Sequence, residues 1–356
     1  MNDGAKSNQE GSRTRGGSSS GVQPGRTSSK KETPIASGGH AASRVIAFMN
    51  QKGGVGKTTT VVNLSAAIAS RGRSVLVIDL DPQAHSTIHL GTDPAALERS
   101  VYDVLLDPSF DAVDALVGAV RPNMSLLPAE TGLAAAEAEL ASDDDRNQRL
   151  SRALEPLKRA YEFILIDCPP SLGVLTLNAL AAAREVVMPM QAHFLALQGV
   201  SKLLETVTLV AQSVNPRLKV SGVVLCMHDE NTRHAREVVA DLESFFEQSR
   251  TPRPSVDGTQ PATLPPWWAA RVYRPAVRRS IKLAESPSFG QSVFEYAPDC
   301  TGAADYLALA DEFIKEWDAL VGGPPTTKPA ASSENKPDSE VVVKGDSARR
   351  AVRAGA

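Results

Sequence analysis

The feature that most constrains the fold is the stretch MNQKGGVGKTTT at residues 49–60. An apolar run, RVIAFMN, precedes it, and a segment with helical spacing, KTTTVVNLSAAIASRG, begins at residue 57. A strand that enters a glycine-rich loop and leaves it as a helix favours an anion, because loop N–H groups and the positive end of the helix both face it. The sequence therefore predicts a phosphate site at this loop.

The loop departs from the common phosphate-binding pattern G-x-x-x-x-G-K-[ST]. Gly56, Lys57 and Thr58 supply the end of the pattern, but Gln51 stands where its first glycine belongs. Lys52 is an additional cation inside the loop. Because Lys57 already serves the β/γ-phosphates, Lys52 has two interpretations: a cation that acts on another subunit's nucleotide, as an arginine finger does, or a solvated lysine near an anion.

Acidic residues close two further apolar runs. SVLVIDLD ends with Asp79 and Asp81, and FILIDCPPS contains Asp167. In nucleotide hydrolases a strand-end aspartate holds the water shell of Mg²⁺, and the loop threonine, here Thr58, coordinates the ion. We therefore expect a nucleotide and Mg²⁺ as cofactors, with Thr58 and Asp167 at the metal; the family resemblance given below implies that the nucleotide is ATP. The residues expected around the nucleotide are Gly53, Gly54, Val55, Gly56, Lys57, Thr58 and Thr59.

Apolar runs alternate with helical stretches through the middle of the chain. This alternation predicts an α/β fold with a mainly parallel, doubly wound sheet and helices on both faces. The proline-rich stretch 249–270 interrupts it and is expected to be an inserted loop, in which Trp267 and Trp268 either pack the loop down or meet a partner. Besides the segments above, strands are expected at 124–129, 185–191 and 219–227, and helices at 131–160, 174–183, 197–213 and 232–248.

The two ends of the chain differ from its middle. Residues 1–43 and 322–356 are rich in small and polar residues, so we expect disordered tails around an ATPase domain spanning 44–321. Such tails are linkers or weak DNA-binding arms. The whole chain carries a net charge of −3, and both tails are basic, so the central part is more acidic than this average. Nucleic-acid contact through the folded part would therefore require a local basic patch.

Cysteine usage and hydropathy indicate a cytoplasmic protein. Cys168, Cys226 and Cys300 are widely spaced and odd in number, which is typical of reduced thiols. No apolar run reaches the length of a membrane span, and the polar N-terminus lacks the apolar core of a signal peptide.

Segments in a fixed order resemble the ParA-type partition ATPases, a deviant-Walker group that includes MinD. They read KGGVGKTTT, DLDPQAHST, DCPPSLGVLTLNAL and LAESPSFG, and the resemblance extends from about residue 44 to 320. It implies an ATP-dependent homodimer in which Lys52 contacts the partner's nucleotide and Lys57 its own. It also implies that Asp81 positions the attacking water and that Asp167 is the Walker B aspartate. Lys52, Lys57 and Asp81 are therefore the expected catalytic residues.

The resemblance also implies partners. ParA-type dimers bind nonspecific DNA on the nucleoid, and a ParB-like centromere-binding protein stimulates their hydrolysis. The segment that aligns with the group's DNA contacts is VRRSIKLAESPSFG, which implies DNA-binding roles for Arg274, Arg278, Arg279 and Lys282. From the residues alone, a solvated basic loop is an equal interpretation. Contacts to phosphates would be blind to sequence and dependent on salt.

Three positions depart from the group's pattern. Arg278 replaces a usual proline, Asn231 stands at a usual arginine, and Arg233 stands at a usual asparagine. Other functions in the group have other requirements. A MinD-type ATPase needs a C-terminal amphipathic helix, which the Pro/Ser/Lys-rich tail does not offer, and a nitrogenase-like iron protein needs paired cluster-ligating cysteines. A relative that positions a protein array or a polysaccharide machine is the alternative to DNA partition.

Overall fold

The computed structural model describes residues 42–251 and 264–322. Residues 1–41 and 323–356 of the predicted tails, and 252–263 of the proline-rich stretch, lie outside these ranges. The strands are β1 Arg44–Phe48, β2 Val75–Asp79, β3 Val117–Arg121, β4 Met124–Leu127, β5 Phe163–Asp167, β6 Glu185–Met190, β7 Lys219–Leu225 and β8 Arg271–Val272. They form one eight-stranded sheet in the order β3-β4-β2-β5-β1-β6-β7-β8. Every neighbouring pair is parallel except β3 and β4.

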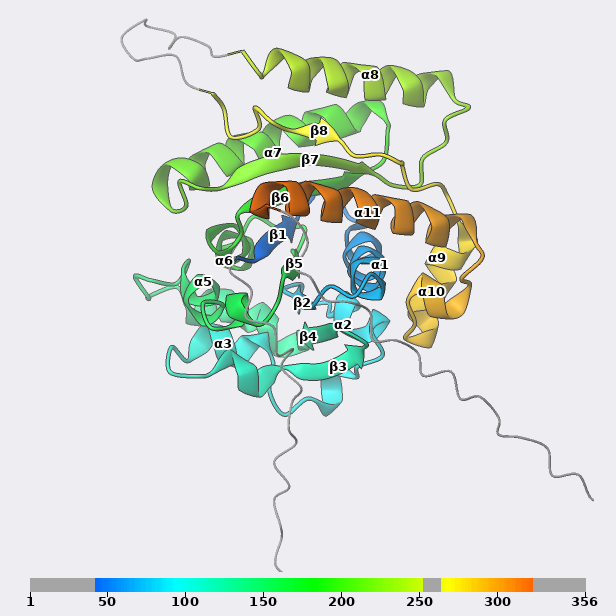
Figure 1. The fold of residues 1–356 in the computed structure, drawn as a ribbon. Coiled ribbons are helices and arrows are strands. Elements are labelled where there is room, and N and C mark those ends of the chain that lie inside the picture. The colour runs from blue at the N-terminus through cyan, green and yellow to red at the C-terminus, as the bar shows by residue number, and fades with distance from the viewer. Residues whose placement is uncertain (1–41, 252–263, 323–356) are drawn as a thin grey trace, which may run out of the picture.

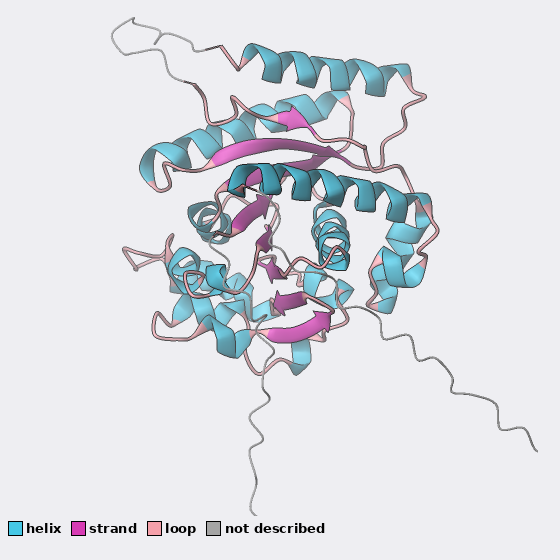
Figure 2. Cartoon of the chain, viewed as in Figure 1, coloured by secondary structure: helices cyan, strands magenta, loops and turns pink. Residues whose placement is uncertain are grey.

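Helices cover both faces of this sheet (Figures 1 and 2). The longest, α11, packs against α1 on one face of the sheet. Within the described ranges, none combines the length and the apolar character that crossing a bilayer requires. The helices are α1 Lys57–Ser70, α2 His85–His89, α3 Val101–Leu106, α4 Ala136–Glu139, α5 Arg149–Ala153, α6 Val174–Ala182, α7 Phe194–Ser213, α8 Arg233–Gln248, α9 Ile281–Glu285, α10 Val293–Tyr296 and α11 Thr301–Val321.

Strand side chains alternate between two apolar cores. In β1, Val45 and Ala47 belong to the core shared with α3, α5, α6 and α7, whereas Ile46 and Phe48 belong to the core under α1 and α11. A strand buried on both faces reads as a continuous apolar run, which is why the pattern was visible in the sequence. The predicted mainly parallel, doubly wound fold is confirmed.

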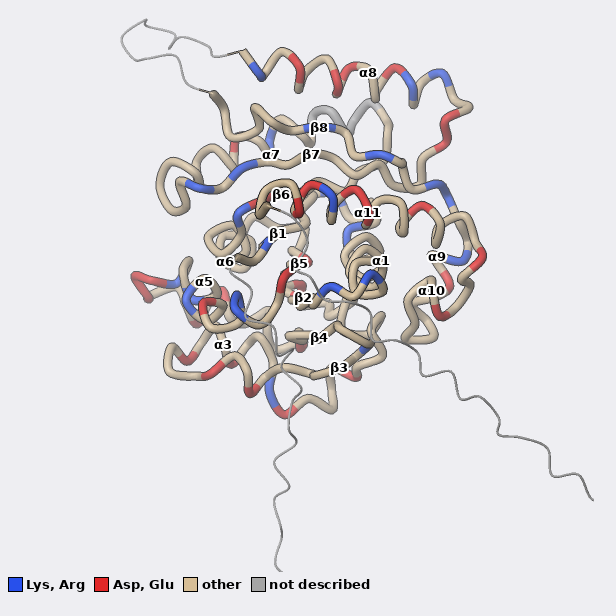
Figure 3. Tube along the Cα trace, viewed as in Figure 1, with Lys and Arg blue, Asp and Glu red and all other residues tan. Residues whose placement is uncertain are grey.

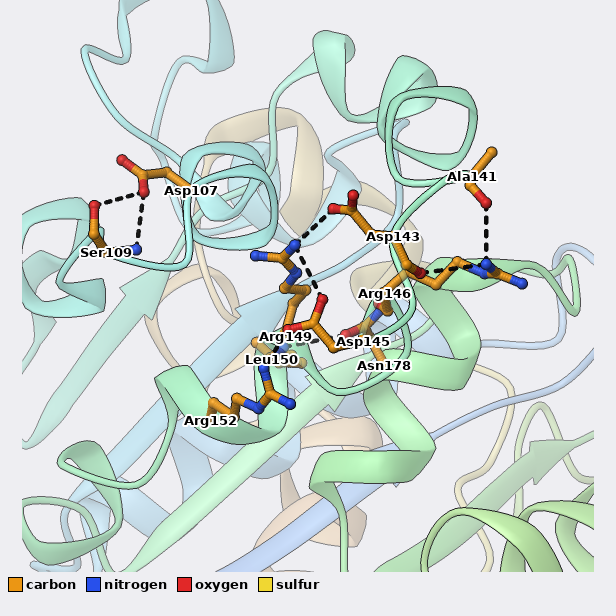
Figure 4. A network of polar contacts seen from close by, with 10 residues as sticks. All are labelled: Asp107, Ser109, Ala141, Asp143, Asp145, Arg146, Arg149, Leu150, Arg152 and Asn178. Carbon is orange, nitrogen blue, oxygen red and sulfur yellow. Dashed lines mark hydrogen bonds and ion pairs between the residues drawn. The ribbon is translucent and has the colours of Figure 1, made fainter.

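The prediction of a single helix over 131–160 is wrong. Only α4 and α5 are α-helical there, and a polar network holds the turns between them (Figure 4). Arg149 forms ion pairs with Asp143 at 2.6 Å and Asp145 at 3.1 Å. Asn178 on α6 donates to the carbonyl of Arg146 at 2.7 Å. Aspartates and asparagines that bind backbone and side-chain groups in this way compete with helical hydrogen bonds, so alanine content alone misled the prediction.

The tryptophan pair divides its roles. Trp267 stacks on Phe245 of α8 with ring centroids 6.5 Å apart, and its indole N–H donates to the Ser249 hydroxyl at 3.1 Å. Trp268 is 46% exposed. Of the two interpretations, packing holds for Trp267.

A buried ion pair ties the sheet to α11. Arg44 is only 2% exposed and donates to Glu185 on β6 at 2.8 Å, to the Phe313 carbonyl at 2.7 Å and to Glu316 at 3.0 Å. Burial acts to raise the pKa of Glu185, but the Arg44 guanidinium, together with the Ser221 hydroxyl and the charge of Lys219, holds that pKa below its usual value. The central strand is thereby fixed to a helix more than 250 residues further along the chain.

Glu185→Ala should lower the free energy of unfolding by about 3 kcal/mol, because it removes a buried partner of Arg44 and leaves the guanidinium under-compensated. Asp311→Ala, which breaks the exposed pair with Arg71, should cost at most about 1 kcal/mol. Urea unfolding followed by circular dichroism measures both. Equal losses in the two variants would contradict a special role for the Arg44 pair.

Candidate functional site

The glycine-rich loop lies between β1 and α1 at the carboxyl edge of the sheet. Gly54 and Gly56 have φ angles of +70° and +96°, which favour glycine. A Cβ on Gly56 would lie 3.2 Å from the Cβ of Cys226, so side-chain packing also restricts this position. At Gly53 and Gly54 an added Cβ would meet nothing within 4 Å. The loop is therefore anchored at Gly56 and faces open space at its tip.

A cavity of about 700 Å³ opens in front of the loop. Segment 81–89 and the turn 169–171 form its other walls, and Pro287 contributes from the far end of the chain. Val55 is the exception among the predicted loop residues, since its side chain is buried and lines a neighbouring cavity. The predicted residues that do line the large cavity are Gly53, Gly54, Gly56, Lys57, Thr58, Thr59 and Asp81.

Asp167 joins two elements beneath this cavity. Its Oδ2 atom accepts a hydrogen bond from the Thr58 hydroxyl at 2.7 Å and another from the Ser86 hydroxyl at 2.8 Å. Its Oδ1 atom is buried and has no hydrogen-bond partner among the residues that the structure describes. Sequence reasoning identified Thr58 and Asp167 but missed Ser86, although DPQAHST contains it.

Burial disfavours the ionised forms of Asp167 and of its neighbour Asp79. Asp79 and Asp167 lie opposite each other in the register of β2 and β5. Burial, followed by the charge of Asp167, raises the pKa of Asp79. Burial also raises the pKa of Asp167, against the lowering effects of the Thr58 and Ser86 hydroxyls and the Lys57 ammonium. A cation beside Oδ1 would stabilise the charged form of Asp167.

These groups fit a hydrated magnesium ion. Mg²⁺ is usually held by one or two carboxylates together with water and substrate phosphates, not by a cage of protein side chains. Within the described ranges, no group of three or more His, Cys, Asp or Glu side chains is arranged to hold a metal by itself. The unpartnered Oδ1 of Asp167 and the hydroxyl of Thr58 supply the oxygen ligands that such an ion prefers.

Asp79 and Asp81 have different positions. Asp79 is fully buried and accepts hydrogen bonds from the Thr87 amide and hydroxyl, both at 2.8 Å, and from the Asp81 amide at 3.1 Å. It therefore shapes the turn that follows β2. Asp81 lines the cavity, and its Oδ1 accepts from the Gln83 amide at 3.0 Å. The turn held by Asp79 thus presents Asp81 to the space in front of the loop.

Lys52 lies outside the large cavity, unlike Lys57. Lys57 is only 8% exposed, and its side chain forms no hydrogen bond or ion pair with the residues that the structure describes. The Lys52 ammonium lies 2.9 Å from Nε2 of His193, beside a separate cavity of about 220 Å³. The two lysines of the loop therefore line different cavities.

Comparisons with known proteins agree with this geometry. A family model described as an AAA domain matches residues 43–220. The sporulation initiation inhibitor protein Soj of Bacillus subtilis is 41% identical over 76% of this chain and 97% of its own length. The chromosome partitioning protein ParA of Caulobacter vibrioides is 39% identical over 76% of this chain and 94% of its own. The chain belongs to the ParA/Soj family of partition ATPases.

Solved structures show the same architecture. A structure described as cobyrinic acid a,c-diamide synthase from Mycobacterium smegmatis, with bound ADP and magnesium, is 37% identical with a TM-score of 0.62, covering 80% of this chain and 100% of that one. The MinD protein of Pyrococcus horikoshii, complexed with Mg-ADP, is 22% identical with a TM-score of 0.56, covering 79% of this chain and 98% of its own. The second likeness shows the fold shared across the MinD/ParA group.

The predicted DNA-binding residues lie near acidic partners. Arg274 pairs with Glu243 at 2.7 Å, and Lys282 pairs with Glu285 at 2.9 Å. Figure 3 shows acidic and basic positions intermixed along α8 and α11. In this ParA-family chain the segment 271–282 is therefore less basic than its own residues suggest.

Arg278 and Arg279 differ from each other. Arg278 donates from its backbone N–H, Nε and Nη2 to the buried carboxylate of Asp305, which gives the departure from proline at this position a structural role. The hydrogen bond with Asp305 raises the pKa of Arg278. Arg279 is exposed and forms no ion pair with any residue in 42–251 or 264–322.

Gly56→Ala should lower the free energy of unfolding by about 1 to 2 kcal/mol, because it places a side chain at a left-handed φ and against Cys226. Gly53→Ala is the matched control, since its Cβ would enter open space. Thermal and urea unfolding of the nucleotide-free proteins measure the difference. A Gly56→Ala protein as stable as Gly53→Ala would contradict the anchoring of the loop at this residue.

Proposed function

We propose that this protein is a DNA-segregation ATPase that dimerises on ATP, binds DNA without sequence preference and hydrolyses ATP when a ParB-like partner stimulates it. One observation carries the proposal: Lys57 and Thr58 line the cavity in front of the loop, and Thr58 is hydrogen-bonded to Asp167, whereas Lys52 lies beside a separate cavity. The sequence identity to Soj and ParA over nearly their whole lengths supports DNA as the molecule that this ATPase segregates.

The residues of the loop, together with Asp81, Ser86 and Asp167, have distinct roles in this proposal. Backbone N–H groups of 53–59 and the positive end of α1 bind the phosphates of ATP, and Lys57 neutralises their charge. Thr58 and Asp167 hold Mg²⁺ and its water, with Ser86 fixing the carboxylate. Asp81 orients the water that attacks the γ-phosphate. When bound, the metal ion neutralises charge on the β- and γ-phosphate oxygens.

Lys52 acts on the nucleotide of a second subunit. In its own subunit Lys52 lies outside the nucleotide cavity, and its side chain is exposed next to His193. A cation supplied across an interface stabilises the charge of phosphoryl transfer without weakening binding of the nucleotide to its own subunit. Dimerisation and hydrolysis are thereby linked through one side chain.

Lys52→Ala should abolish ATP-dependent dimerisation and lower partner-stimulated hydrolysis by on the order of 10³-fold, while ATP binding stays within a few-fold of wild type. Lys57→Ala is the contrasting variant and should lose ATP binding itself. Fluorescent-nucleotide binding, light scattering and phosphate release measure the three properties. A Lys52→Ala protein that dimerises and hydrolyses ATP normally would contradict the role of Lys52 across the interface.

DNA binding in this proposal depends on the segment 271–282 and above all on Arg279. Three of the predicted cations already have carboxylate partners, so each contact with a DNA phosphate requires a partner exchange. Arg279 is exposed without such a partner in the described ranges and is available without exchange. Binding through so few free charges is expected to be weak per subunit and sensitive to salt.

Arg279→Ala should weaken ATP-dependent DNA retention several-fold and reduce the slope of log affinity against log salt by about two for the dimer, as expected for one lost phosphate contact in each subunit. Arg217→Ala is the control. Arg217 is likewise exposed, but it lies just before β7 and therefore at the amino ends of the parallel strands, away from the glycine-rich loop. Fluorescence anisotropy with unrelated duplexes, at several salt concentrations, measures both. An unchanged salt slope in Arg279→Ala would reject its contact with DNA.

The solved structure described as a cobyrinic acid diamide synthase raises amide synthesis as a second function. Transfer of nitrogen from glutamine through a covalent intermediate needs an accessible, activated nucleophile such as a thiolate. Cys168 and Cys226 are fully enclosed, and burial raises the pKa of both thiols. Cys300 accepts a hydrogen bond from the Ala303 amide as the cap of α11. The cysteines therefore favour partition over this chemistry.

A further inference from the structure

The contact between Lys52 and His193 joins two separate elements. Lys52 belongs to the glycine-rich loop, whereas His193 follows β6 and precedes the first turn of α7. Their Nζ and Nε2 atoms are 2.9 Å apart. Both side chains line the cavity of about 220 Å³ beside the loop, and no other described residue that lines this cavity carries a titratable group.

Hydrogen bonds fix the two backbones relative to each other. The Asn50 amide donates to the Pro189 carbonyl at 2.8 Å, and its Oδ1 accepts from the Lys52 N–H at 3.0 Å. Gln191 donates to the Gly54 carbonyl at 3.2 Å. The loop is therefore attached to the end of β6 on both sides of Lys52, and the approach of Lys52 to His193 follows from this attachment.

The chemistry of the pair requires a neutral histidine. An ammonium group has donors and no acceptor, so Nε2 of His193 must accept, with the ring proton on Nδ1. A neutral acceptor orients the lysine and leaves its full positive charge for a phosphate. A carboxylate at the same place would orient the lysine but also neutralise it. Protonated His193 has no acceptor and repels the ammonium.

We propose that His193 is a positioning residue for Lys52, and that it holds the lysine ready for the nucleotide of a second subunit only while the imidazole is neutral. The inference rests on the proposed function of Lys52. It adds that assembly of the ATP dimer weakens as His193 gains a proton, and that the β6–α7 connection takes part in assembly through Lys52.

The test is the ATP- and Mg²⁺-dependent dimerisation of the full chain, followed by light scattering at about pH 8 and about pH 5.5, which span the range where histidine changes charge. His193→Ala should weaken the dimer at the higher pH by up to about fivefold, the scale of an exposed polar pair. His193→Gln keeps an uncharged acceptor on the same element. It should assemble like wild type at the higher pH and show a smaller loss at the lower pH.

Binding of a fluorescent ATP analogue to the monomer is measured in parallel, because Asp79 and Asp167 also have raised pKa values and affect the site directly. His193 has no role there, so both His193 variants should follow the wild-type pH profile of nucleotide binding. The proposal is overturned if His193→Ala assembles like wild type at the higher pH, or if His193→Gln keeps the full wild-type pH dependence of assembly.

Lys52→Ala separates failure of this inference from failure of the proposed function. If Lys52→Ala still dimerises, the role of Lys52 across the interface is wrong, and the positioning role of His193 falls with it. If Lys52→Ala does not dimerise and His193→Ala is normal, Lys52 keeps its role and only the role of His193 is rejected.

Discussion

The carboxylate of Asp167 is the group on which the rest of the site depends. It ends the strand between β1 and β2, so the loop after β1 and the turn after β2 both reach it. Thr58 and Ser86 bind one of its oxygens, and the other is buried and unpartnered. Because burial raises the pKa of Asp167, a cation beside this carboxylate would stabilise its ionised form.

The parallel order of the strands explains why so many functional groups meet. The carboxyl ends of β1, β2, β5 and β6 carry the glycine-rich loop, the turn with Asp81, Asp167 and the connection with His193. Ligands of open α/β sheets bind at this edge, where neighbouring connections diverge. The nucleotide cavity uses the first three, and Lys52 with His193 faces a second space beyond them. One sheet edge thus supports both nucleotide binding and the proposed contact with a second subunit.

Charge is balanced locally over much of the surface. Arg278 is committed to buried Asp305, and Arg274 and Lys282 have carboxylate partners. In the proposed function this leaves segment 271–282 with little free positive charge for DNA, so a dimer that doubles the contacts binds much more strongly than a monomer. In the proposed function, assembly of the dimer is what links ATP to DNA retention.

The sequence by itself determined the alternation of buried strands and helices, the loop, and the acidic residues at the carboxyl ends of β2 and β5. These are short-range patterns, because a few consecutive residues are enough to indicate a buried strand or a phosphate-binding loop. Only the tertiary structure decided that 131–160 breaks around Asp143 and Arg149, that Arg278 belongs to Asp305, and that Lys52 meets His193. The residues of the last two pairs lie 27 and 141 positions apart in the chain. A local sequence pattern does not indicate which distant side chain pairs with a charged group, so these contacts could be found only in the tertiary structure.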